Sequence, residues 1–132
     1  MQISNKINKY ELNEIFTIRD QTIDVNHYLQ KSHIGISVSH EEGMSNSILE
    51  YMNYNMPVIG TRVGGTIELI ENNYNGLLIN KNNEQELINA IIHYIDNYNL
   101  ISIHGGNSKK IVNKKFNIEK CVDAYFSLYN SL

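Results

Sequence analysis

The sequence predicts an α/β fold, a Rossmann-like parallel sheet flanked by helices, and three observations support it. Short apolar runs rich in β-branched residues occur at 34–39, 58–61 and 77–79, as in strands that are buried on both faces. Amphipathic stretches with helical spacing separate these runs. The stretches are long enough to carry the chain back across the sheet, so consecutive strands can run parallel. Ligands of such sheets bind beyond the carboxyl ends of the strands.

Composition limits the classes of function. The 132 residues suffice for one domain, and the net charge of −3 gives nucleic-acid binding no support. The only basic cluster is a mild one, formed by Lys109, Lys110, Lys114 and Lys115. A single cysteine, Cys121, excludes an internal disulfide framework and is typical of a reducing compartment. No stretch resembles a signal peptide or a membrane span, so we expect a cytoplasmic protein, free or peripheral at the inner membrane face.

The first third of the chain is expected to hold three elements. Residues 1–13 are polar and weakly patterned, and no element is predicted there. Residues 14–18 alternate as a short strand does. A short helix follows at 22–31, with Thr22 as its N-cap, and the buried strand at 34–39 comes next.

The remaining elements follow from caps, breakers and apolar stripes. Ser45, Asn46 and Ser47 offer caps for a helix that ends near Asn55, before the only proline, Pro57. A tight turn at 63–66 leads from the second strand into a helix at 67–70, and a loop at 72–76 precedes the third strand. Three further helices are expected. The first spans residues 83–97, the second begins after a break at 104–107 and ends at 115, and the third spans 118–128.

Residues 39–50, the central stretch, join a predicted strand to a predicted helix through a turn with carboxylates. Backbone amides of residues 44–47 would open this helix and form an anion site, of which a phosphate is the natural occupant. Glu42 on the loop could accept hydrogen bonds from sugar hydroxyls, and Glu50, one turn into the helix, could hold a ribose diol. We expect the two carboxylates to face a shared pocket that suits a nucleotide sugar.

Structural alternatives exist for each of these features. The spacing of Ser47 and Glu50 also fits a capping box, and from spacing alone the two interpretations are equally good. Gly64 and Gly65 without other context are more often a turn than a phosphate loop. The five histidines have no metal-ligand spacing, and His40, beside the turn, is expected to be a solvated loop residue.

Several linked motifs carry a resemblance to a known family. They are the E-x7-E motif of Glu42 and Glu50, the run at 57–65, the triplet Glu68-Leu69-Ile70, and the run at 75–79. In this order they resemble the group 1 glycosyltransferases, family 4 of the GT-B fold, and the resemblance extends from about Ile15 to Tyr129. It implies the C-terminal donor-binding domain, which transfers a glycosyl group from a nucleotide sugar with retention of anomeric configuration.

The resemblance also implies roles for individual residues. Glu42 would be the catalytic residue that holds the donor-sugar hydroxyls, and Glu50 would hold the ribose. Residues 44–48 would bind the diphosphate through backbone amides, and Gly43 would keep the loop close to the donor. The implied donor-binding set is Glu42, Gly43, Met44, Ser45, Asn46, Ser47 and Glu50. No metal or other cofactor is implied beyond the substrate itself, a donor such as a UDP- or GDP-sugar.

The sequence also departs from the family. It lacks the N-terminal acceptor domain and the first two strands of the donor domain, with their Arg and Lys. In the strand order 3-2-1-4-5-6 these strands would lie between the predicted strands at 14–18 and 34–39. Either the strand at 14–18 moves in to pair, or an open edge remains that invites another chain. We therefore expect self-association, or a separate polypeptide with the missing N-terminal half.

These observations lead to one leading hypothesis and two alternatives. In the leading hypothesis, residues 1–132 form a single, incomplete nucleotide-sugar-binding domain of a retaining glycosyltransferase. That enzyme would serve polysaccharide or glycoconjugate synthesis with an unknown sugar or lipid-linked acceptor. The chain alone should turn over little, because donor and acceptor domains must close on each other. The alternatives are a non-catalytic remnant that binds a nucleotide sugar or a partner protein, and an unrelated α/β module.

Overall fold

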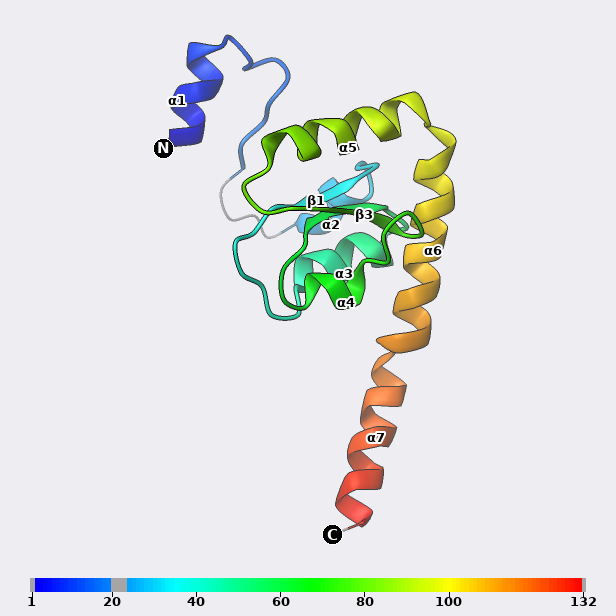
Figure 1. The fold of residues 1–132 in the computed structure, drawn as a ribbon. Helices are drawn as coiled ribbons and strands as arrows, with labels where there is room; N and C mark the ends of the chain where they lie inside the picture. Colours follow the sequence, from blue (N-terminus) through cyan, green and yellow to red (C-terminus); the bar gives the residue numbers. More distant parts are fainter. Residues whose placement is uncertain (1, 20–23, 132) are drawn as a thin grey trace.

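The computed structural model describes residues 2–19 and 24–131, and within them it contains a three-stranded parallel sheet (Figure 1). The strands are β1 (Gly35–Ser37), β2 (Val58–Thr61) and β3 (Gly76–Ile79), in the order β1-β2-β3. Gly35 pairs with Val58 and Ile59 with Leu77. The predicted α/β fold with a parallel sheet is confirmed.

Helices cover both faces of the sheet. α5 (Glu84–Asp96) lies above it in Figure 1, and α3 (Asn46–Asn53) and α4 (Thr66–Leu69) lie below. Two core clusters match this arrangement. Val58 packs with residues of α3, α4 and α6 (Asn99–Lys115), whereas its neighbour Ile59 packs with residues of α5. Successive strand residues point to opposite faces, so the fully buried β2 joins the two halves of the core.

The N-terminal part differs from the prediction. The strand expected at 14–18 is absent, and Ile15 and Phe16 instead donate to the Leu12 carbonyl in a turn. A helix that the sequence did not predict, α1 (Gln2–Lys9), precedes this turn. A short strand needs a partner for its backbone groups, and among the described residues no strand pairs with this segment.

The helix expected at 22–31 is shorter than predicted. It is α2 (Val25–Leu29), and the Asp24 side chain accepts a hydrogen bond from the backbone N–H of His27 at 3.2 Å. Asp24 is therefore the N-cap. The predicted cap, Thr22, lies outside the described residues.

β1 is an edge strand, and its burial was predicted wrongly. Ile36 is 41% exposed and Val38 is 56% exposed, although the run was expected to be buried on both faces. Gly35 donates to Pro57 at 3.0 Å, so the alternation of a parallel ladder turns the N–H and C=O of Ile36 away from β2. Among the described residues no strand pairs on that side. Of the two expected outcomes, the structure has the open edge.

The C-terminal helices differ in one feature. The break expected at 104–107 is absent, because α6 continues through Gly105 and Gly106. α7 (Ile118–Asn130) then extends away from the sheet (Figure 1). Its apolar stripe is exposed and consists of Val122, Tyr125, Phe126 and Tyr129. No helix in the described part of the chain is long and apolar enough to cross a bilayer.

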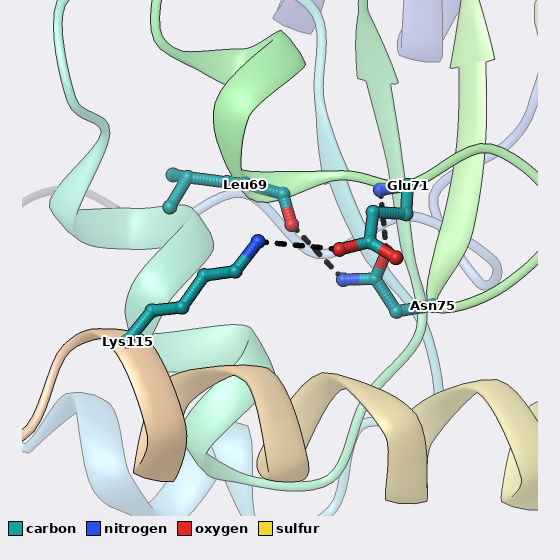
Figure 2. A network of polar contacts seen from close by, with 4 residues as sticks. All are labelled: Leu69, Glu71, Asn75 and Lys115. Atoms are coloured by element: carbon teal, nitrogen blue, oxygen red, sulfur yellow. Dashed lines mark hydrogen bonds and ion pairs between the residues drawn. The ribbon is translucent and has the colours of Figure 1, made fainter.

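A buried asparagine ties the loop before β3 to its surroundings (Figure 2). The fully buried Asn75 accepts a hydrogen bond from the Glu71 N–H at 2.7 Å and donates one to the Leu69 carbonyl at 3.0 Å. Ser108 of α6 donates to the Asn75 carbonyl at 3.1 Å, and Lys115 forms an exposed ion pair with Glu71. Through Ser108 and Lys115, α6 is thus joined to the loop that precedes β3.

Candidate functional site

The central stretch lies where β1 ends and α3 begins, at the carboxyl end of the sheet. The buried Ser45 is the N-cap, and its hydroxyl accepts a hydrogen bond from the Ile48 N–H at 3.5 Å. Of the first three helical N–H groups, only that of Ile48 has an acceptor within the described residues. The N–H groups of Asn46 and Ser47 are therefore available to a ligand, as at other helix starts. The strand, turn and helix predicted here are confirmed.

The position of the cap removes the capping-box alternative for Glu50. With Ser45 as the N-cap, Ser47 is the second helical residue and Glu50 the fifth. A capping box needs its glutamate at the third position, which Ile48 occupies. Glu50 is exposed and makes no capping hydrogen bond within the described residues.

Glu50 lines a groove between α3 and the end of α6, with a volume of about 510 Å³. Its apolar residues are Leu49, Val112 and Phe116, and its polar residues are Asn46, Glu50, Asn53, Asn113 and Asn117. Carboxylate and amide groups of this kind can bind hydroxyl groups. Glu42 does not line this groove, so the shared pocket expected for the two carboxylates is not seen there.

Glu42 is half-buried and is held by its own loop. The Ser39 hydroxyl donates to Glu42 Oε1 at 2.6 Å, and the Gly65 N–H donates to the Glu42 carbonyl at 3.1 Å. Gly43 and Met44 follow on the exposed side of the loop. A Cβ added at Gly43 would meet no atom within 4 Å, so open space lies beside the backbone here.

A second cavity of about 250 Å³ lies beside this turn, across the carboxyl ends of the strands. Ser39, His40 and Thr61 line one side, and residues 80–84 line the other. Asn80 donates to Glu86 from its backbone N–H at 2.6 Å and from its side chain at 2.9 Å. These hydrogen bonds lower the pKa of Glu86, and Arg62 contributes in the same direction. The loop after β3 is thereby fastened to α5.

The electrostatic surroundings of Glu50 affect one neighbour. Burial of Tyr51 raises the pKa of its hydroxyl, and the Glu50 carboxylate raises it further.

No group of three or more His, Cys, Asp or Glu side chains that could hold a metal occurs within residues 2–19 and 24–131. Transfer without a metal remains a prediction.

Two features of the site were missed from the sequence. The Thr61 hydroxyl is hydrogen-bonded to the backbone of Ser39, and Gly64 and Gly65 lie directly against the backbone of Glu42 and Gly43. The sequence indicated a tight turn at 63–66 but did not connect it with Glu42. A usable signal existed, because turns after neighbouring parallel strands lie side by side at the same edge of a sheet.

The sequence is similar to those of known glycosyltransferases. The model of the family described as glycosyl transferases group 1 matches residues 2–97. An uncharacterised glycosyltransferase of Methanocaldococcus jannaschii is 36% identical over an aligned length of 132, which covers 99% of this chain and 37% of that protein. The UDP-Gal:α-D-GlcNAc-diphosphoundecaprenol α-1,3-galactosyltransferase of Escherichia coli is 31% identical over 106 residues, 80% of this chain and 27% of that protein. The chain thus spans about a third of the length of these relatives.

Comparison with solved structures identifies the fold. Anabaena HepE in complex with UDP has a TM-score of 0.93 and 22% identity, over 99% of this chain and 36% of that one. The C-terminal domain of the group 1 glycosyltransferase LpcC from Francisella tularensis has a TM-score of 0.78 and 22% identity, over 89% of this chain and 62% of that one. The fold is thus the partial C-terminal half of a GT-B glycosyltransferase.

Proposed function

This chain belongs to the group 1 glycosyltransferases, and from that premise we propose that its central stretch binds the nucleotide-sugar donor. The observation that carries the proposal is the helix start at Asn46 and Ser47, whose N–H groups lie in sequence between two carboxylates. A phosphate is attracted by these donors and by the helix dipole. The carboxylates would repel the phosphate but can accept hydrogen bonds from the sugar hydroxyls beside it.

Each part of the donor is assigned to a part of the stretch. Backbone amides of residues 44–48 bind the diphosphate, Glu42 binds the hydroxyls of the donor sugar as the catalytic residue, and Glu50 binds the ribose diol. The open space beside Gly43 supports close approach of the ligand to the backbone. The exposed position of Glu50 in its groove, free of a capping role, supports its role as a ligand-binding residue.

We further propose a retaining glycosyltransferase that uses a UDP- or GDP-sugar in polysaccharide or glycoconjugate synthesis. Two relatives are named for such acceptors, the E. coli galactosyltransferase and a poly(ribitol-phosphate) α-N-acetylglucosaminyltransferase of Staphylococcus aureus. Helix-start amides take the role of a cation, so no metal is required. An enzyme with a nucleotide-sugar donor and a lipid-linked acceptor would work in the cytoplasm, at the inner membrane face.

A binding titration tests the donor site. UDP and GDP, with UDP-glucose and GDP-mannose, are titrated into the full chain by calorimetry. We expect saturable binding of either the uridine ligands or the guanosine ligands. Glu50→Ala should weaken this binding roughly 10- to 100-fold, because hydrogen bonds to a charged group contribute about 1.5–3 kcal/mol. Glu41→Ala, a change at an exposed neighbour, is the matched control and should bind as the wild type does. Absence of saturable binding, or binding unaffected by Glu50→Ala, would contradict the proposal.

We also propose that the open β1 edge takes another chain, either a second copy or a polypeptide with the remaining part of the enzyme. Within residues 2–19 and 24–131 no strand pairs with the outer side of Ile36, and the side chains of Ile36 and Val38 are exposed; both observations support this proposal. We expect light scattering to show self-association of the isolated chain, and Ile36→Lys to reduce it. Ile103→Lys, at an exposed position of α6, is the control. A wild-type chain that stays monomeric at high concentration argues against self-association and leaves the separate polypeptide to be tested by co-purification.

A further inference from the structure

We propose that Ser39 is a positioning residue for Glu42, and that Thr61 at the end of β2, together with Gly64 and Gly65 in the turn that follows, holds the two of them in place. This inference rests on the proposed function, because it assigns Glu42 to the donor sugar. It adds residues that hold Glu42 in position, and none of them belongs to the E-x7-E motif. Three contacts within and between the segments at the carboxyl ends of the neighbouring strands β1 and β2 support the inference.

The first contact fixes the carboxylate itself. The Ser39 hydroxyl donates to Glu42 Oε1 at 2.6 Å in a half-buried setting. A hydrogen bond to an ionised carboxylate at this length is among the stronger ones in proteins. Oε2 has no hydrogen-bond partner within the described residues, so one oxygen is anchored while the other remains for a ligand hydroxyl.

The second contact fixes Ser39. The Thr61 hydroxyl donates to the Ser39 carbonyl at 2.7 Å and accepts from the Ser39 N–H at 3.1 Å. One side chain thus satisfies both backbone groups of Ser39. Thr61 is only 4% exposed and belongs to the buried strand β2, so the anchor is part of the core.

The third contact fixes the backbone of Glu42. The Gly65 N–H donates to the Glu42 carbonyl at 3.1 Å. A Cβ at Gly64 would lie 1.8 Å from that carbonyl oxygen, and a Cβ at Gly65 would lie 2.5 Å from the Gly43 oxygen. Gly64 also has a positive φ of 38°. The glycine pair is therefore explained by close packing of two backbones, and no phosphate loop is needed to account for it.

Together these contacts predict a selective effect on the sugar half of the donor. Glu42 is restrained at its side chain, through Ser39, and at its main chain, through residues 64 and 65. Pre-orientation of a binding group lowers the entropy lost when the ligand binds. The nucleoside diphosphate binds to other groups, namely the helix amides and Glu50. Loss of the Ser39 hydroxyl should therefore weaken sugar recognition and leave diphosphate recognition intact.

The test compares a nucleoside diphosphate with the same diphosphate esterified to a sugar. Dissociation constants for UDP and UDP-glucose are measured on the full chain for the wild type, Ser39→Ala, Ser39→Thr and the control Ser32→Ala. GDP and GDP-mannose replace them if the wild type prefers guanine. The wild type should bind the nucleotide sugar more tightly than the free diphosphate. Ser39→Ala should lose about ten-fold of this preference, Ser39→Thr should restore it, and Ser32→Ala should leave it unchanged.

A double substitution separates positioning from folding. In a Glu42→Ala background, Ser39→Ala should have no additional effect on the preference, because there is no carboxylate left to orient. If Ser39→Ala does not fold, Ser39→Cys replaces it, since a thiol is similar in size and a weak donor. A preference that is unchanged by Ser39→Ala, or equal weakening of both ligands, overturns this inference and leaves the proposed function standing. A wild type that binds neither ligand overturns both.

Discussion

At the scale of single residues, Gly105 shows how one missing side chain lets α6 pack onto α3. A Cβ at Gly105 would lie 1.9 Å from the Asn55 carbonyl oxygen, whereas one at the next residue, Gly106, would meet nothing within 4 Å. Gly105→Ala should therefore lower the free energy of unfolding by about 1–3 kcal/mol through overpacking. Gly106→Ala should raise it by about 0.5–1 kcal/mol, because alanine favours a helix interior. Urea unfolding of both variants checks the pair, and similar effects of the two would be inconsistent with the contact.

Candidate roles of residues in the central stretch could be predicted because they depend on neighbours that are close in sequence. Ser45 stands before an apolar stripe and was among the expected caps, and Glu42 and Glu50 follow from their spacing. The partners of these residues could not be predicted. Ser39 and Thr61 are 22 positions apart, and only the parallel pairing of β1 with β2 brings them together. Interactions between distant segments depend on register, which a single sequence pattern does not contain.

At the scale of elements, the start of α3 offers a direct test of the cap that orders the proposed phosphate site. Ser45→Ala removes the hydroxyl that accepts from Ile48 and should lower the free energy of unfolding by about 1 kcal/mol. Ser47→Ala, two positions later and exposed, should change it by less than about 0.5 kcal/mol. Thermal and urea unfolding measure both variants. A larger loss for Ser47→Ala would place the cap at Ser47 and restore the capping box with Glu50.

Elements with strong local signals were predicted well, and elements that depend on partners were not. The helix from Glu84 to Asp96 has an Asn83 cap and a regular apolar stripe, and it forms within one residue of its expected end. The strand expected at 14–18 had only its alternation, and without a neighbouring strand the segment forms turns. At residues 104–107 two glycines predicted a break, but the helix α6 continues through them. Packing of Gly105 against Asn55 there outweighs the low helix propensity of glycine.

At the scale of the whole molecule, a buried tyrosine and histidine join α5 to α6 over one face of the sheet. Tyr94 is fully buried, His104 is 5% exposed, and the Tyr94 hydroxyl and His104 Nδ1 are hydrogen-bonded at 2.9 Å. Tyr94 belongs to the core cluster that contains Ile59 of β2. Burial, and then the nearby His93, lower the pKa of His104 below its ordinary value of 6.5. The folded state therefore takes up a proton here less readily than the unfolded chain.

This difference in proton uptake makes the stability of the whole fold depend on pH. Above about pH 6.5 His104 is neutral in both states, and its contribution is fully present. As the pH falls below 6.5 the unfolded chain binds the proton first, so the free energy of unfolding decreases until the lowered pKa is passed. The melting temperature should thus fall between pH 7.5 and pH 5. His104→Gln should reduce this dependence although it lowers stability at pH 7.5, whereas His27→Gln, at an exposed position of α2, should retain it. If the melting temperatures of His104→Gln and the wild type change equally with pH, another group is responsible for the pH dependence.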